Sequence, residues 1–513
     1  MGAGTVNAET RRRFLIGTGL VLVGSGMGGA ALARLPDPQI AGVSAGRIDL
    51  EGSSEAVQRL YGGGGQPLWS ERSARAFELA IGGAGAHGLD PQPYLALIDS
   101  SPSTGDRDLN RSRAALAYAR ALAVGLVDPA ELFDIYTLAR DAPDLVEGLR
   151  GALSQERVAE WLEGLAPQDA QYLALSAAYI DLSGQSGGAQ ATPITGGPPI
   201  RPGDRDRRRP AVLAALARER AMAPSQSTVS LVWTMADADL LKTYQRSRGL
   251  AEDGIVGPNT LALINASSGD KARRLAVNLE RLRWLQRRPP PTRIDVNTAA
   301  STMAYIVDDQ IVWTTVVVTG SPGHETPQLQ AGFSRLVVNP PWYVPASIAR
   351  REITPRGPAY LARNHMRRVS GRIIQAPGPW AALGQVKFDM QNPYAIYLHD
   401  TPAKAVFSRS QRHRSHGCIR VKDAVSFARR LARESGNRGS FDRTLESGRT
   451  GVVALAAEIP VRLIYQTALV DEDGAVTFRP DVYGWDVRTA QAMGLTPPDQ
   501  TGIEAITAAP LGP

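Results

Sequence analysis

The residues best suited to covalent chemistry lie in the run Ser415–Arg420, which contains the chain's single cysteine, Cys418. A thiol attacks a carbonyl group as the thiolate, so it needs a base or a positive field nearby. His399 stands fifteen intervening residues before this run, and His416 lies within it. The pattern therefore indicates a cysteine nucleophile, with His399 as the principal candidate for the base.

Gly417 directly precedes the cysteine and permits a close approach of substrate to the main chain. The N–H groups of Gly417 and Cys418 are then candidates for an oxyanion hole. A buried structural cysteine is the alternative, but its polar neighbours argue against an apolar core. A metal site is a second alternative, with His399, His413, His416 and Cys418 as its ligands. The spacing of these four residues along the chain fits no common zinc pattern. We expect no metal and no organic cofactor.

The residues that must position this run lie within 292–490, where the sequence pattern predicts a β-rich domain. Residues 301–307 and 311–318 alternate around a polar turn and predict a hairpin. Residues 395–399 predict a short strand that ends at His399. Residues 421–434 have apolar residues at helical spacing and predict an amphipathic helix.

The rest of the chain divides by composition, and we expect a multidomain α+β protein. Residues 50–185 predict a helical scaffold domain, and 229–268 predict a small helical module. Residues 186–228 are rich in Gly, Pro and Arg and predict a flexible linker. Residues 345–385 are basic, with helical and irregular stretches, and suggest an inserted subdomain, and 491–513 predict a loose tail.

The first 33 residues have the order charged, apolar, small that is typical of an export signal. Arg11–Leu15 resembles the twin-arginine pattern, and Ala31–Ala33 resembles a cleavage site. An ordinary secretory signal or an uncleaved anchor is the alternative. We expect a periplasmic protein, exported by a twin-arginine signal or tethered to the inner membrane through it, with no other membrane contact.

The composition excludes several classes. The 513 residues are 43% hydrophobic and 21% charged, which is ordinary for a globular chain of about three domains. One cysteine cannot form an intramolecular disulfide. The net charge is +7, and the basic residues are scattered among acidic ones. A nucleic-acid partner is therefore not indicated, whereas an anionic polymer is compatible.

The pattern from His399 to Arg420, H-x15-S-H-G-C-x-R, resembles the signature of the L,D-transpeptidase (YkuD) catalytic domain. Other stretches resemble the YcbB-type branch, which has large chains: Asn278–Leu285, Val338–Ile348, Tyr397–Pro402, and Pro67–Trp69 with Gly88–Pro91. Several members of that branch carry serine where His416 stands, so the resemblance does not decide whether His416 is required. The run Leu241–Leu261, with Asp253-Gly254-Ile255-Val256-Gly257-Pro258 at its centre, resembles a three-helix peptidoglycan-binding module.

The resemblance implies a mechanism. Cys418 would attack the diaminopimelate carbonyl of a peptidoglycan tetrapeptide stem, release D-Ala and form a thioester. A side-chain amine of a second stem would resolve it to a 3–3 cross-link. His399 would take the thiol proton, His416 would orient or share that role, and Gly417 would help hold the oxyanion. Carbapenem-type β-lactams would acylate the same thiol.

Candidate substrate-binding residues follow from the same resemblance: Arg420, Ser415, Trp342, Tyr343 and Tyr397. Arg420 is either a clamp under the loop or a ligand of a substrate carboxylate, and the aromatic residues line a donor groove or belong to the core. The acyl-enzyme could instead serve protein anchoring, D-amino-acid exchange or hydrolysis. A non-catalytic peptidoglycan-binding scaffold is the alternative of a different class.

Overall fold

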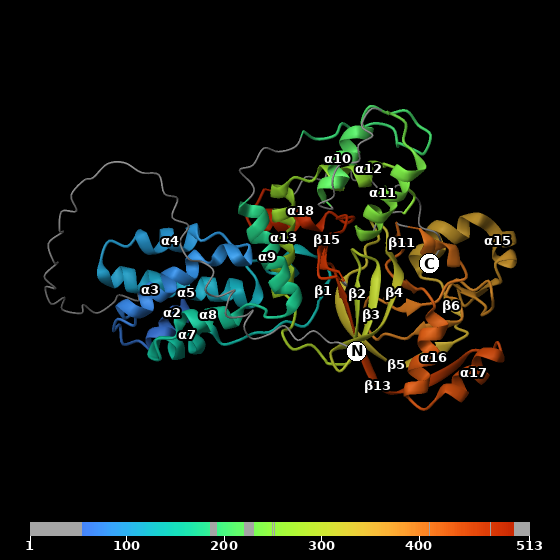
Figure 1. The fold of residues 1–513 in the computed structure, drawn as a ribbon. Helices are drawn as coiled ribbons and strands as arrows, with labels where there is room; N and C mark the ends of the chain where they lie inside the picture. The colour runs from blue at the N-terminus through green and yellow to red at the C-terminus, as the bar shows by residue number, and fades with distance from the viewer. Residues whose placement is uncertain are drawn as a thin grey trace, which may run out of the picture. The chain divides into compact units, whose positions relative to one another are not determined.

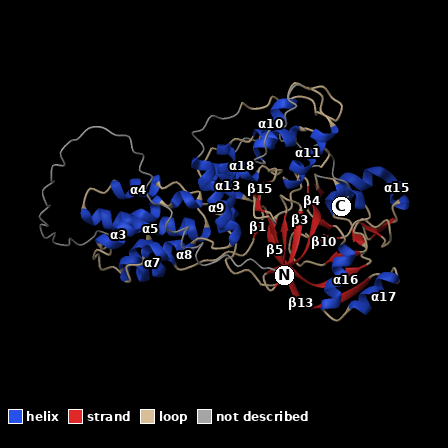
Figure 2. Ribbon diagram, viewed as in Figure 1, coloured by secondary structure: helices blue, strands red, loops and turns tan. Residues whose placement is uncertain are grey.

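The computed structural model describes residues 54–184, 192–219, 230–248, 250, 252–409, 411–471 and 473–496. Figures 1 and 2 show helices over the N-terminal part of this range and strands gathered in the C-terminal half. The mixed α+β class and its division into a helical scaffold and a β-rich domain are therefore confirmed. The predicted signal at 1–33 lies outside the described residues. Among the described helices, none has the length and apolar content needed to cross a membrane.

The scaffold domain is built from amphipathic helices that share one core. The core contains Phe77, Ile81, Tyr118 and Leu149, all at most 2% exposed. Ser70 starts one of these helices by accepting a hydrogen bond from the Ser73 N–H, which satisfies a free helix-end donor. The elements are α2 (Glu55–Tyr61), α3 (Glu71–Gly82), η1 (Ala84–His87), α4 (Gln92–Asp99), α5 (Thr104–Val124), α6 (Pro129–Leu132), β1 (Tyr136–Thr137), α7 (Leu145–Ser154), α8 (Val158–Leu165) and α9 (Ala170–Gly184).

The predicted linker at 186–228 is wrong over its described part. Residues 192–219 contribute α10 (Arg209–Glu219) and pack against α11 (Met235–Ser247) and α12 (Pro258–Asn265). Trp233 is fully buried among the apolar side chains of this unit, and Ile200 and Val256 pair as an isolated β-bridge. Val212, Ala215 and Leu216 are buried and have the spacing of one helix face, a signal that the high Gly, Pro and Arg content of the segment outweighed in the prediction.

Helix α13 (Ser268–Arg283) leads into the β-rich domain and bonds to elements on both sides. Its Arg283 donates to the His87 carbonyl and the Tyr172 hydroxyl of the scaffold. Its Arg281 forms a fully buried ion pair with Asp486. A buried guanidinium is stable only with such partners, so the pairs fix this helix against both neighbours.

The β-rich domain contains a sheet in the order β1-β5-β13-β2-β3-β4-β12-β10-β9. Strand β9 also pairs with β5, so within the described residues eight strands close on themselves as a barrel. The predicted hairpin is confirmed as β3 paired with β4, and the strand at His399 as β10. The strands are β2 (Arg293–Asn297), β3 (Thr302–Val307), β4 (Gln310–Gly320), β5 (Gln328–Val338), β9 (Val386–Phe388), β10 (Leu398–His399), β11 (His413–Ser415), β12 (Ile419–Val421) and β13 (Gly451–Ile464).

Two helices cover part of this sheet. The predicted amphipathic helix is confirmed as α16 (Ala424–Glu434), whose Phe427 is fully buried against sheet residues such as Phe388. Helix α17 (Arg438–Glu446) follows it, and the short turn η4 (Lys404–Ser408) lies before β11. The C-terminal part consists of β14 (Ala468–Val470), β15 (Val476–Phe478) and α18 (Trp485–Ala492). The predicted loose tail starts too early, because α18 extends to Ala492; residues 497–513 lie outside the described range.

The inserted subdomain predicted at 345–385, which the resemblance implies is a helical lid, contains more strand than the sequence indicated and begins three residues earlier, at Trp342. It combines α14 (Ala346–Ile348), the π-helical turn η2 (Ala349–Ile353), η3 (Thr354–Arg356) and α15 (Gly357–Arg363) with a three-stranded sheet of β6 (Trp342–Tyr343), β7 (Met366–Val369) and β8 (Arg372–Gln375). Its small core contains Trp342, Ile348, Ile353 and Ile373. The many arginines of the stretch hid the short alternating strands.

Candidate active site

Cys418 lies in the short loop between β11 and β12, with its side chain partly exposed. Its Sγ lies 3.7 Å from the carbonyl oxygen of Ala395. Removal from water raises the pKa of the thiol, and hydrogen bonds from Tyr397, followed by the charges of Lys387 and Arg420, offset this only in part. The thiol is therefore protonated at rest and needs a base to become a nucleophile.

His399 is placed to be that base. Strand β10 runs parallel to β12, with Leu398 opposite Ile419 and His399 opposite Arg420. The Ile419 N–H donates to the Tyr397 carbonyl at 3.0 Å, so the residue pairing continues to the level of Cys418. A parallel pairing sets neighbouring strands about 4.8 Å apart, so the strand of His399 lies beside the strand that begins one residue after Cys418.

The tautomer of His399 is fixed by its backbone contact. Its Nδ1 lies 2.5 Å from the Asp400 carbonyl oxygen, which can only accept, so Nδ1 carries the proton. Its Nε2 is buried and has no hydrogen-bond partner among the described residues. Burial, followed by the charge of Arg420, lowers the pKa of His399 to about 3. The ring is therefore neutral at pH 7, with an available lone pair on Nε2.

Tyr397 lies between the cysteine and the lid. Burial raises the pKa of its hydroxyl far above the usual value, and the Cys418 thiol beside it adds to that rise. The ring packs against the lid core that contains Trp342, and Lys387 Nζ lies 4.5 Å from its centroid. The predicted groove residue Trp342 is 2% exposed and belongs to this core, whereas Tyr343 is 63% exposed.

The Ser415 side chain stabilises the Cys418 loop through hydrogen bonds to its backbone. Its Oγ donates to the Cys418 carbonyl at 2.6 Å and accepts from the Gly417 N–H at 3.1 Å. Thr326 donates from Oγ1 to the Gly417 carbonyl at 2.9 Å, and Ser321 donates from its N–H to the Ser415 carbonyl. The fully buried Ser415 is thus placed to hold the loop rather than to meet a substrate.

Gly417 has a φ of 105°, a conformation that favours glycine. An added Cβ would lie 3.3 Å from Ile396 Cδ1 and 3.6 Å from the Glu325 carbonyl oxygen. The Gly417 N–H is already bonded to Ser415, whereas no acceptor is found for the Cys418 N–H in the described part of the chain. The Cys418 N–H is therefore the better-placed donor for an oxyanion.

Arg420 is 2% exposed and lies in the sheet between Val318 and His399. Burial lowers the pKa of its guanidinium to about 10, while the neighbouring Cys418 opposes that change. This position favours a buried electrostatic role beneath the loop over direct contact with a substrate carboxylate.

His416 points away from these groups toward the lid. Its Nε2 lies 2.6 Å from Glu352 Oε1, and its ring centroid lies 4.7 Å from that of His324. Sequence reasoning missed Glu352, His324 and Thr326. A lone glutamate among arginines is typical of a solvated surface, so no signal marked Glu352 as part of the site.

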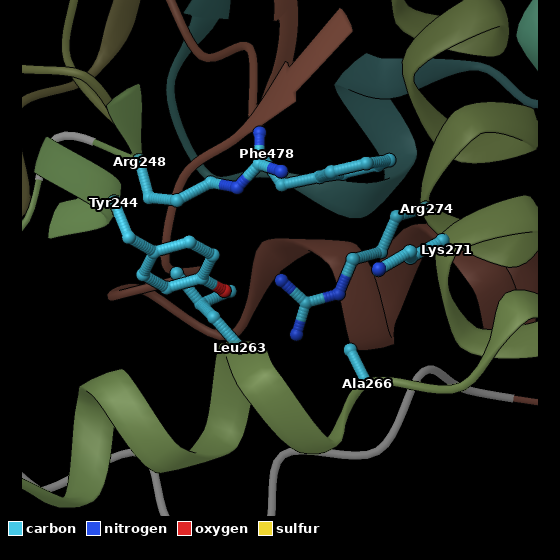
Figure 3. A pocket seen from close by; sticks show the side chains of 7 residues that line it. All are labelled: Tyr244, Arg248, Leu263, Ala266, Lys271, Arg274 and Phe478. Atoms are coloured by element: carbon cyan, nitrogen blue, oxygen red, sulfur yellow. The ribbon is translucent and has the colours of Figure 1, made fainter. Parts of the chain in front are cut away.

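The described residues contain no group of three or more His, Cys, Asp or Glu side chains that could hold a metal ion. His413, one of the residues weighed as a metal ligand, is buried, and its Nε2 lies 2.8 Å from the Thr298 carbonyl oxygen. A separate recess is drawn in Figure 3. It is lined by Tyr244, Arg248, Leu263, Ala266, Lys271, Arg274 and Phe478, none of which belongs to the Cys418 site.

A family model describing the L,D-transpeptidase catalytic domain (YkuD) matches residues 291–451, and one describing a scaffold domain matches 55–178. The first range contains Cys418, His399 and the lid. Over residues 291–451 the chain is therefore similar to the L,D-transpeptidase catalytic domain. A curated protein of Haemophilus influenzae, named "Putative L,D-transpeptidase", is 31% identical over 238 residues, which is 42% of this chain. The match spans about half of that relative, 48% of its length.

Solved structures of L,D-transpeptidases are more distant. The enzyme from Stackebrandtia nassauensis is 14% identical, with 53% of this chain and 97% of that chain covered and a TM-score of 0.23. The Enterococcus faecium enzyme, solved as a cysteine-to-serine mutant, is 13% identical, with 34% and 50% covered and a TM-score of 0.16. These scores are too low to carry an argument, so the assignment rests on the family model and the sequence relative.

Proposed function

We propose that this protein is a periplasmic L,D-transpeptidase that forms 3–3 cross-links in peptidoglycan through a thioester on Cys418. The observation that carries the proposal is the arrangement of His399. Its Nδ1 is held by the Asp400 carbonyl, its unprotonated Nε2 has no partner among the described residues, and its strand lies beside that of Cys418. A neutral imidazole with a free lone pair next to a protonated thiol is the requirement for general-base activation.

In the acylation step, Cys418 Sγ forms a bond to the diaminopimelate carbonyl carbon while the thiol proton passes to His399 Nε2. The oxyanion of the tetrahedral intermediate accepts a hydrogen bond from the Cys418 N–H. The C–N bond to D-Ala then breaks, and the proton on His399 passes to the departing amine.

In the second step, the side-chain amine of an acceptor stem attacks the thioester carbonyl. A proton of that amine passes to His399 Nε2, the C–S bond breaks, and the proton returns to the sulfur of Cys418. A new amide bond joins the two stems. His399 thus carries a proton from the thiol to the leaving amine in the first step, and from the acceptor amine to the sulfur in the second. A neutral imidazole can do this without a metal or organic cofactor.

Location and targeting are part of the proposal. The arginine pair and apolar run at the N-terminus support twin-arginine export to the periplasm, where peptidoglycan lies. The module containing α11 and α12, with its Asp253–Pro258 turn, would hold the enzyme on peptidoglycan and raise the local concentration of stems. The net charge of +7 favours approach to stems that carry free carboxylates.

The test is a product assay with the purified mature protein, disaccharide-tetrapeptide monomers and the Cys418→Ala variant. A cross-linked dimer that has lost one D-Ala, formed by the wild type alone, is the expected result. Tripeptide without dimer would shift the function to hydrolysis of the same acyl-enzyme. An added D-amino acid or a lysine-containing acceptor protein separates exchange from anchoring. Equal products from both proteins, or none, would favour a non-catalytic scaffold.

Carbapenem-type β-lactams supply a second test of the same nucleophile. Their strained carbonyl would be attacked by Cys418, with no amine acceptor needed. We expect one covalent adduct for each wild-type chain by intact-protein mass spectrometry, and none for Cys418→Ala.

A further inference from the structure

The contact between Glu352 and His416 joins the lid to the catalytic loop. Glu352 Oε1 lies 2.6 Å from His416 Nε2, and a carboxylate can only accept, so Nε2 carries the proton. The His416 side chain is 10% exposed and that of Glu352 is 33% exposed. Partial shielding from water makes this pair stronger than an ordinary surface pair.

Glu352 lies in a segment whose backbone conformation is uncommon in proteins. It lies in the five-residue π-helical turn η2, between the buried residues Ile348 and Ile353. Single π-turns are rare and occur often at functional sites. The two isoleucines pack into the lid core, whereas the Glu352 side chain contacts His416 of the Cys418 loop.

The lid has a second contact with the site through Tyr397. The lid core containing Trp342 packs on the Tyr397 ring, and the pKa of the Tyr397 hydroxyl responds to the Cys418 thiol beside it. The lid therefore reaches the cysteine loop from two directions, by an apolar contact at Tyr397 and by a charged contact at His416.

The other side of the loop contacts the segment that joins β4 to β5. The Gly417 carbonyl is held by Thr326, and the His416 ring lies against His324 from the same segment. Thr326 is buried, whereas His324 is exposed. On the lid side, the Glu352 carboxylate contacts this loop through His416.

We propose that Glu352 is a positioning residue that ties the lid to the loop through His416 and thereby sets how the thioester partitions between an acceptor amine and water. This inference rests on the proposed function. In aminolysis the amine forms the new C–N bond, and in hydrolysis a water oxygen forms a C–O bond. In both, the C–S bond breaks and the sulfur takes a proton. A lid held in place limits the entry of water while the thioester waits for its acceptor.

The experiment measures the ratio of tripeptide to cross-linked dimer from tetrapeptide monomers, in full-length enzyme. The variants are Glu352→Ala, the nearly isosteric Glu352→Gln, His416→Ala and the double variant Glu352→Ala with His416→Ala. Glu446→Gln, on α17, removes one exposed negative charge outside the lid and the Cys418 loop and is the matched control. Thermal unfolding of each variant shows whether its fold is intact.

We expect Glu352→Ala to raise the tripeptide-to-dimer ratio about three- to tenfold, the effect of losing one partly shielded charge-assisted hydrogen bond. Glu352→Gln should give a smaller rise, because its amide oxygen still accepts from Nε2. The double variant should match either single variant within about twofold, since both remove one contact. The Glu446→Gln control should match the wild type.

An unchanged ratio in Glu352→Ala and Glu352→Gln, with wild-type enzyme that forms dimers, would overturn the inference. So would additive effects in the double variant, or a lower melting temperature and total turnover with an unchanged ratio, which would mark a structural role alone. A wild type that forms neither product would overturn the proposed function itself, together with this inference.

Discussion

The acid side of the pH–rate profile offers a sharp test of the His399 assignment. Burial and the charge of Arg420 lower the pKa of this histidine to about 3, while burial raises that of Cys418 above its usual value. Between these two values the free enzyme holds a neutral imidazole and a neutral thiol. A general-base reaction of that pair has a rate that does not depend on pH within this window.

The size of the effect follows from the two pKa values. At pH 5 an ordinary histidine of pKa about 6.5 is only about 3% neutral, whereas one of pKa about 3 is about 99% neutral. Lowering the pH from 7 to 5 would thus slow acylation about 25-fold with an ordinary histidine. With His399 as the structure places it, the loss is less than about twofold.

The assay is the rate of covalent adduct formation with a carbapenem, followed by intact-protein mass spectrometry from pH 5 to 8. Far-ultraviolet circular dichroism at each pH confirms that the protein stays folded. A fall centred near pH 6.5 would refute the buried, neutral His399. A tenfold rise per pH unit across the whole range would show that a free thiolate reacts without a base, which would refute the general-base role.

Three further predictions concern the loop and the buried charges. Gly417→Ala, at a φ of 105°, should slow adduct formation at least about tenfold and lower the free energy of unfolding by about 1–2 kcal/mol, as measured by urea denaturation; wild-type values would contradict the strained loop. Arg281→Ala leaves the fully buried Asp486 without its partner and should cost about 3–5 kcal/mol, and a loss below about 1 kcal/mol would show that the pair is not buried in solution. Burial lowers the pKa of both His87 and His413 to about 4. Below pH 6.5 the unfolded chain therefore binds more protons than the folded one. The free energy of unfolding should fall by about 1.4 kcal/mol per pH unit for each of these two histidines as the pH drops from 6.5 to 4. Melting temperatures of the His413→Asn variant should fall less steeply over that range than those of the wild type, and parallel curves would count against a neutral buried ring.

Local signals in the sequence were enough to predict the elements around the nucleophile. The alternation on either side of residues 308–310 predicted the hairpin of β3 and β4, and helical spacing predicted α16. The cysteine and the histidine were predicted as site residues because their residue types carry chemistry wherever they lie. These features depend on neighbours within a few residues, which a single sequence displays directly.

Features made by long-range contacts were not visible. The burial of residues 192–219 depends on Trp233 and on helices that follow in the chain. The position of Ser415 inside the loop, and that of Glu352 against His416, depends on how separate segments meet. Periodicity reports which face of an element is apolar, but it does not report which distant polar group faces it.

The most direct test of the central claim is to trap the acyl-enzyme. Full-length protein is mixed with a tetrapeptide donor, quenched in acid within seconds, digested, and analysed by mass spectrometry. The account predicts a mass increase equal to the donor without D-Ala, located on the peptide that contains Cys418 and lost on treatment with hydroxylamine. A product formed without any adduct on Cys418, or an adduct at another residue, would contradict it.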